Sequence, residues 1–134
     1  MGVLIDASVL IEHERAGLDL EAETDGRDDE FFLSVVTASE LLHGVHRAEA
    51  ASVRARRSAF VEAVLAGFPL LDIDVATARA HARLGAELAA SDRKVGAHDL
   101  WLAASCLAHG LSLATLDRRD FARIPGLSVE VWGR

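Results

Sequence analysis

The sequence predicts an α/β fold: one domain over residues 1–134, with a central, mostly parallel sheet of about five strands and helices on both faces. Two observations predict this class. Short apolar runs alternate along the chain with longer segments of helical periodicity. These runs are apolar throughout, whereas a strand with one exposed face alternates apolar and polar residues, so we expect both faces of the sheet to be covered.

The first half of the chain begins with a predicted strand and a predicted helix. The run at 3–5 predicts the first strand, and a helical pattern from Val9 closes at Gly17. The run at 31–36 predicts a second, buried strand, after which Thr37 opens a helix that continues through Val45. A further helix over 54–65 ends at Gly67.

The second half repeats the same alternation. A strand is predicted over 70–73, and Asp74 is the expected N-cap of a long helix that contains Leu84 and Leu88. The segment 99–109 is apolar on nearly all sides, which predicts a buried helix that stops at Gly110. Strands over 112–116 and 127–131 complete the sheet.

Composition limits the classes of protein that this chain can belong to. With 134 residues and 51% hydrophobic side chains, the chain is able to bury a full core without metal or disulfide cross-links. The single cysteine, Cys106, excludes an intrachain disulfide framework and a cysteine-rich zinc site, and we expect it to be a small buried hydrophobe. The apolar start is interrupted at once by Asp6, and the longest uncharged run, 100–116, contains a helix stop. We therefore expect a cytoplasmic protein with no membrane span.

The net charge is −7, and the segment from Glu12 to Glu30 accounts for all of it, with nine acidic residues against Arg15 and Arg27. A protein with this balance does not bind nucleic acid through a broad basic surface, so such an activity would need a local site and a metal. Two interpretations of the acidic segment stay open. It is either a solvated helix and loop or a docking surface for a basic partner.

Four acidic residues are expected at one edge of the sheet. Asp6 ends the first strand, Glu40 lies in the first turn after the second, Asp99 opens the buried helix, and Asp117 follows the strand over 112–116. Right-handed crossovers bring the carboxyl ends of parallel strands to the same edge. Each residue also has a structural interpretation: Asp6, Asp99 and Asp117 as helix caps or first-turn acids, and Thr37 with Glu40 as a capping box.

Carboxylates held close together repel one another, and a divalent cation is the natural compensating charge. Magnesium prefers oxygen ligands and acts beside phosphates, so an acidic pocket in a cysteine-poor domain favours phosphoryl chemistry. The hydroxyls of Ser8 and Thr115 lie next to this set in the sequence. Either they orient a carboxylate or a metal-bound water, or they cap the chain locally.

Four motifs follow one another along the chain: Asp6-Ala7-Ser8, Thr37-Ala38-Ser39-Glu40-Leu41, Gly96-Ala97-His98-Asp99-Leu100, and Thr115-Leu116-Asp117-Arg118-Arg119-Asp120-Phe121. In this order and spacing they are similar to those of PIN-domain ribonucleases, and in particular to the VapC-type toxins of type II toxin-antitoxin systems. The resemblance covers nearly the whole chain. It implies that Asp6, Glu40, Asp99 and Asp117 bind Mg²⁺ or Mn²⁺, with Asp120 as an auxiliary acid, and that the protein hydrolyses RNA phosphodiester bonds. It also implies a homodimer and a cognate basic antitoxin that docks along the first helix and the acidic segment.

Two other functions remain as alternatives. A receiver-like signalling domain has similar size and alternation, but it needs paired acids after the first strand and a lysine after a late strand, whereas this chain has Asp6 alone and Lys94 before a helix. A catalytically inactive PIN-fold binding module is the other alternative.

Several other polar residues are candidates of lower weight. We interpret His43 and His46, which follow Glu40, as residues of a solvated helix face rather than metal ligands. Phosphate contacts and solvated faces explain the remaining basic groups about equally well, and a functional role is favoured for Arg118 and Arg119 because they adjoin Asp117. These groups are Arg54, Arg56, Arg57, Arg118, Arg119 and Arg123.

Overall fold

A computed structural model describes residues 1–133; Arg134, the last residue of the predicted domain, lies outside them. The strands form one five-stranded sheet in the order β3-β2-β1-β4-β5, and every neighbouring pair is parallel. The strands are β1 (Gly2–Ile5), β2 (Glu30–Ser34), β3 (Leu70–Leu71), β4 (Ser112–Thr115) and β5 (Val129–Val131). The predicted α/β class and parallel sheet are confirmed.

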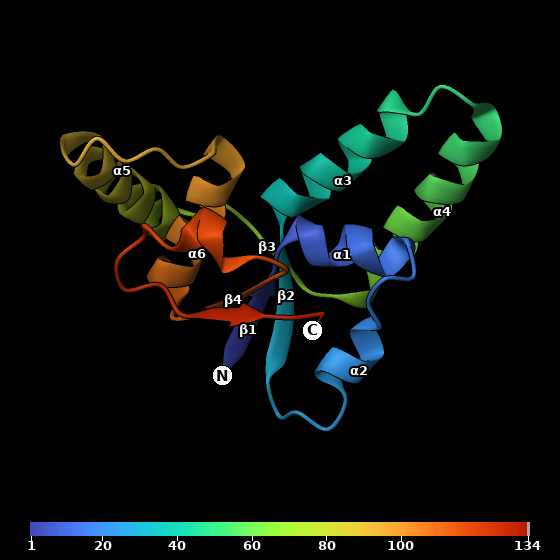
Figure 1. Cartoon of the computed structure of the whole chain (residues 1–134), viewed down its shortest axis with the longest axis horizontal. Helices are drawn as coiled ribbons and strands as arrows, with labels where there is room; N and C mark the ends of the chain where they lie inside the picture. Colours follow the sequence, from blue (N-terminus) through green and yellow to red (C-terminus); the bar gives the residue numbers. More distant parts are fainter. Residues whose placement is uncertain (134) are drawn as a thin grey trace.

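Helices cover both faces of the sheet (Figure 1). They are α1 (Ala7–Glu14), α2 (Leu20–Thr24), α3 (Val35–Arg47), α4 (Ala51–Gly67), α5 (Val75–Ala90), α6 (Ala97–His109) and the short 3₁₀ helix η1 (Arg118–Phe121). Val3 and Ile5 of β1 pack in a core with α1, α3 and α4, while Leu4 between them packs in a second core with α5 and α6. The strand is therefore buried on both sides, which is why its sequence is apolar throughout.

The strand order changes direction between β1 and β4. From β1 the chain continues outward through β2 and β3, whereas β4 and β5 lie on the other side of β1. The crossovers leave these two strands toward opposite faces, so a crevice forms outside their carboxyl ends, where sheets of this kind bind their ligands. Asp6 follows β1 at this point, and its backbone N–H donates to Ala114 O of β4 at 2.9 Å.

The start of α3 differs from the prediction. The helix begins at Val35, because Ser34 is its N-cap and the Ser34 hydroxyl accepts a hydrogen bond from Val36 N at 3.0 Å. Thr37 is instead a buried residue inside the first turn, and its hydroxyl has no hydrogen-bond partner within the described chain. The predicted capping box of Thr37 with Glu40 is therefore wrong, and Glu40 is not needed as a capping residue.

The first helix ends earlier than predicted. It stops at Glu14, and Ala16 takes a left-handed conformation with φ of 62°. The N–H groups of Ala16 and Gly17 donate to the carbonyls of His13 and Glu12, both at 3.0 Å, which is the hydrogen-bond pattern of a Schellman ending. Two predicted strands are also shorter than expected. The strand predicted over 70–73 covers only Leu70–Leu71, and the strand predicted over 127–131 begins at Val129.

The remaining predictions about helices are confirmed. Asp74 is the N-cap of α5 and accepts from Thr77 N at 2.8 Å, and α6 ends at Gly110, which has φ of 66°. Cys106 is buried in α6, as expected, and burial raises the pKa of its thiol to about 12. Over residues 1–133 the structure contains no helix whose length and apolar character would let it cross a bilayer.

Candidate active site

Asp6 is held by two hydroxyl groups in the crevice. It is only 8% exposed, and its Oδ2 accepts hydrogen bonds from Ser8 Oγ at 2.8 Å and from Thr115 Oγ1 at 2.9 Å. Although Asp6 occupies the N-cap position of α1, its side chain makes no capping hydrogen bond. The interpretation of Asp6 as a side-chain cap is therefore wrong, and the two hydroxyls orient a carboxylate, as one of the sequence interpretations expected.

Asp99 lies in the first turn of α6, whose N-cap is Gly96. It is a first-turn acid and not a cap. Burial, followed by the negative charges of Asp6, Asp120 and Glu40, raises the pKa of the Asp99 carboxyl to about 6, with His98 acting in the opposite direction. The structure thus brings together four acidic residues, from the end of β1 and from α3, α6 and η1, that lie far apart in the sequence.

Glu40 projects from the second turn of α3. Burial raises the pKa of its carboxyl, the charge of Asp6 adds to this effect, and His98 opposes it. His98 Nδ1 lies 3.4 Å from Glu40 Oε1, so the two side chains form an ion pair whenever the imidazole is protonated. His98 was not singled out in the sequence analysis, and its position next to Asp99 is the only signal that could have found it.

Asp117 follows β4 and has a capping role that one sequence interpretation predicted. Its Oδ1 accepts from Arg119 N at 2.9 Å, and its Oδ2 accepts from Arg119 Nε at 2.8 Å. Hydrogen bonds to Asp117 are the largest effect on Arg119 and raise the pKa of its guanidinium. Asp117 N also lies 3.5 Å from Thr115 Oγ1, the hydroxyl that holds Asp6, so Asp117 belongs to the same edge of the sheet.

The donor chemistry of these residues fits a hard divalent cation. All the candidate donors are carboxylate oxygens. The pKa of Asp99 is raised first by burial and then by the negative charges of Asp6, Asp120 and Glu40, which a cation would offset. Between residues 1 and 133, no three His, Cys, Asp or Glu side chains are arranged as a ready-made metal site. Binding a cation would therefore require side-chain rotation, most directly at Glu40 and Asp117, which are bonded to His98 and Arg119.

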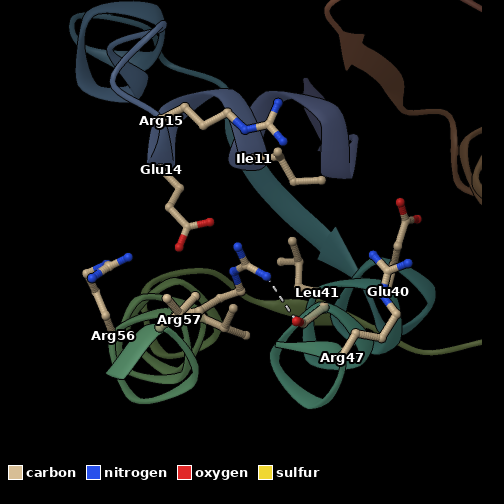
Figure 2. A pocket seen from close by; sticks show the side chains of 11 residues that line it. Ile11, Glu14, Arg15, Glu40, Leu41, Arg47, Arg56 and Arg57 are labelled. Carbon is tan, nitrogen blue, oxygen red and sulfur yellow. Dashed lines mark hydrogen bonds between the residues drawn. The ribbon is translucent and has the colours of Figure 1, made fainter. Parts of the chain in front are cut away.

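The other polar candidates fall outside this cluster. His43 and His46 are exposed on α3, as predicted. Arg54 donates to Ala48 O at 2.8 Å, where it closes the turn between α3 and α4. The remaining predicted phosphate-binding residues of this region, Arg56 and Arg57, lie on α4 in a groove beside Glu40 (Figure 2).

Comparison with known proteins defines the class to which this fold and site belong. The PIN domain family model matches residues 3–127. Ribonuclease VapC1 of Rickettsia felis is 33% identical over 129 residues, which are 96% of this chain and 95% of that protein. The chain therefore belongs to the PIN domain family and, within it, to the VapC ribonucleases.

Two solved structures extend this result. VapBC-5 of Mycobacterium tuberculosis, a member of the VapBC family of toxin-antitoxin systems, superposes with a TM-score of 0.76 at 36% identity, over 98% of this chain and 97% of that one. VapBC2 of Rickettsia felis, bound to a DNA fragment from its promoter, shares the fold with a TM-score of 0.88 at 20% identity, over 98% and 99% of the two chains. The receiver-like alternative is wrong, because the chain has the PIN fold.

Proposed function

We propose that this protein is a toxin of a toxin-antitoxin pair that hydrolyses RNA phosphodiester bonds internally, with Mg²⁺ or Mn²⁺ held by Asp6, Glu40, Asp99 and Asp117. Asp120 is the auxiliary acid of the site. The observation that carries the proposal is the gathering of these carboxylates at one edge of the sheet, where burial and the charges of Asp6, Asp120 and Glu40 raise the pKa of Asp99. Repulsion between such carboxylates destabilises the folded protein unless a bound cation offsets their charge, so clusters of this kind are typical of functional sites.

Each residue has a part that follows from its contacts. A bound divalent cation supplies activation of water and stabilises charge on the scissile phosphate. Asp6 is a fixed ligand, because Ser8 and Thr115 restrict its rotation. His98 lies 3.4 Å from Glu40 and, when its imidazole is protonated, would hold the Glu40 carboxylate at the rim of the cluster. Attack by water requires no help from the ribose 2′-hydroxyl, so the products carry a 5′-phosphate and a 3′-hydroxyl.

The decisive experiment compares three purified proteins on a mixture of cellular RNAs with Mn²⁺. We expect the wild-type protein to cleave RNA and EDTA to stop it. Asp99→Asn should lower the rate by at least about a hundredfold, because it removes a charge from the proposed cation site. Glu62→Gln is the matched control, since Glu62 is an exposed acid on α4. Equal rates for Asp99→Asn and Glu62→Gln would contradict the proposed site, and a wild-type protein without activity would favour the inactive binding module.

We also propose that the cognate antitoxin is basic and docks along α1 and the acidic segment. The acidic segment runs from the last turn of α1 through α2 to the first residue of β2, and α1 connects it to the carboxylate site (Figure 1). Charge complementarity mainly accelerates association. Glu21, Asp25 and Asp28 are among the exposed acids of this segment, whereas Asp29 forms an ion pair with Arg27 at 2.8 Å and Glu23 accepts a hydrogen bond from Gly133 N at 2.8 Å.

The docking surface is tested by neutralising Glu21, Asp25 and Asp28 together. Glu21→Gln, Asp25→Asn and Asp28→Asn should slow association with the antitoxin and weaken its dependence on salt. The control neutralises Glu49, Glu62 and Asp72, which are exposed elsewhere. An unchanged association rate for the first triple variant would contradict docking at this surface.

We also propose that the protein is a cytoplasmic homodimer. Light scattering of the purified protein should then give twice the 14.4 kDa chain mass.

A further inference from the structure

A groove of about 350 Å³ lies between α1, α3 and α4, beside the carboxylate site. Its floor is formed by apolar side chains that include Ile11, Leu41 and Val61, and its walls carry charged groups from all three helices (Figure 2). We call it the arginine groove, because Arg15, Arg47, Arg56 and Arg57 line it.

The arginine groove is positively charged although the protein is not. It holds four of the 14 basic residues of the chain and only two acids, Glu14 and Glu40, in a protein with a net charge of −7. A concave surface concentrates such a field more than a flat one does. The groove is therefore a local site of the kind that a globally acidic protein needs in order to bind a polyanion.

Most of the guanidinium groups in the groove are available to a ligand. Among residues 1–133, Arg15, Arg47 and Arg56 have no hydrogen-bond or ion-pair partner for their side chains, and all three are exposed. Arg57 is anchored, because its Nη1 donates to Gly44 O at 3.1 Å. Within the described chain, no ion pair therefore neutralises the charge of these three guanidinium groups.

The groove and the carboxylate site share a residue. Glu40 lines the groove and is also one of the charges that raise the pKa of Asp99. A chain lying in the groove would therefore reach the carboxylates without leaving the protein surface. The groove has no aromatic side chain, so it offers guanidinium groups for phosphates and no platform on which bases could stack.

From this continuity and charge, and resting on the proposed ribonuclease function, we propose that the arginine groove binds the phosphate backbone of one RNA strand next to the bond that is cut. Arg15 at the C-terminal end of α1 and Arg56 on α4 face the strand from opposite walls, and Arg47 on α3 contacts the phosphate nearest Glu40. Such contacts give affinity and register but read no base. Selection between RNA sequences must then come from other surfaces.

The test measures binding of a fluorescein-labelled single-stranded RNA in EDTA, so that cleavage does not enter the result. Arg15→Gln with Arg56→Gln should raise the dissociation constant by roughly tenfold at moderate salt, and the salt slope of log K should shrink by roughly 0.7 for each phosphate that the variant no longer neutralises. The matched control is Arg79→Gln with Arg83→Gln, which removes the same charge from exposed positions on α5. Arg15→Lys with Arg56→Lys should retain most of the binding.

Three results would overturn the inference. One is an equal loss of RNA binding in the groove and α5 variants, which would reflect net charge alone. Another is an unchanged salt slope in the groove variant. The third is normal RNA binding together with abolished antitoxin binding, which would assign the groove to the antitoxin. None of these results depends on cleavage, so failure of the proposed function, seen as a wild-type protein inactive with Mn²⁺, is distinguishable from failure of the groove.

Discussion

Thr115 Oγ1 donates a buried hydrogen bond of 2.9 Å to Asp6 Oδ2, across 109 positions of the sequence. The two residues lie at the ends of the adjacent parallel strands β4 and β1. Because both side chains are buried, water does not compete for this hydrogen bond, and the carboxylate is held in one orientation. Asp6 is therefore positioned by the pairing of two strands and not by its own helix.

Removing the Thr115 hydroxyl should impair the site without unfolding the protein. Thr115→Val keeps the side-chain shape but leaves Asp6 with Ser8 as its hydroxyl partner. We expect the rate of RNA cleavage to fall by about 10-fold to 100-fold, as for other groups that orient a metal ligand. Thr115→Ser retains the hydroxyl and is the control. Equal rates for the Val and Ser variants would show that this hydrogen bond does not position Asp6.

Melting temperatures should reveal the cation site without any assay of RNA. In EDTA, Asp99→Asn should melt above the wild type, because it removes repulsion from Asp6, Asp120 and Glu40. With Mg²⁺ at about a hundred times its dissociation constant, the wild type should gain roughly 2.7 kcal/mol, or on the order of ten degrees, and the variant much less. The order of the two proteins should therefore reverse. Parallel shifts would mean that Asp99 takes no part in cation binding.

Cation binding should weaken in acid. The pKa of Asp99 is raised to about 6, so its carboxyl is largely protonated at pH 5 and largely ionised at pH 7. Because a proton and a cation compete for this group, the apparent Mn²⁺ affinity should be about tenfold lower at pH 5 than at pH 7. Titration calorimetry at the two pH values checks this expectation. In Asp99→Asn the part of the pH dependence that belongs to this residue should be absent.

The raised pKa of Asp99 also makes the stability of the metal-free protein depend on pH. The folded-state pKa of Asp99 lies above its ordinary value of 3.8, so folding favours the protonated form. The contribution of this group to the free energy of unfolding is therefore greatest below about pH 4 and is lost as pH rises through 6. Urea denaturation in EDTA should show this loss in the wild type and not in Asp99→Asn.

The start of α3 offers a test of stability away from the carboxylates. Ser34→Ala removes the hydroxyl that caps Val36 N and should cost about 1 kcal/mol of the free energy of unfolding. Thr37→Val replaces a buried hydroxyl that has no partner in the described structure, so we expect it to be neutral or stabilising. Urea denaturation distinguishes the two variants. A larger loss for Thr37→Val than for Ser34→Ala would restore the capping box that the sequence suggested.

The sequence determined the fold class and the edge at which the acids gather. Continuous apolar runs such as 3–5 and 31–33 required a sheet covered on both faces, and parallel strands place the residues that follow them at one edge. Asp6, Glu40, Asp99 and Asp117 could therefore be assigned to that edge from their positions after strands or in first turns. The order and spacing of the four motifs indicated the PIN domain family, which the comparisons confirm.

Only the tertiary structure decided which of several local interpretations applies to each residue. The sequence predicted that the helix opens at Thr37, whereas β2 ends at Ser34 and Ser34 itself caps the helix that follows. Likewise, the local sequence allows the Asp6 side chain either to cap its own helix or to accept hydrogen bonds from hydroxyl groups. The pairing of β4 with β1 decides between them, because it places Thr115 beside Asp6. The arginine groove is assembled from three helices that the sequence separates, so no local pattern could predict it. Local propensity fixes the elements, whereas contacts between residues far apart in the chain depend on how those elements pack.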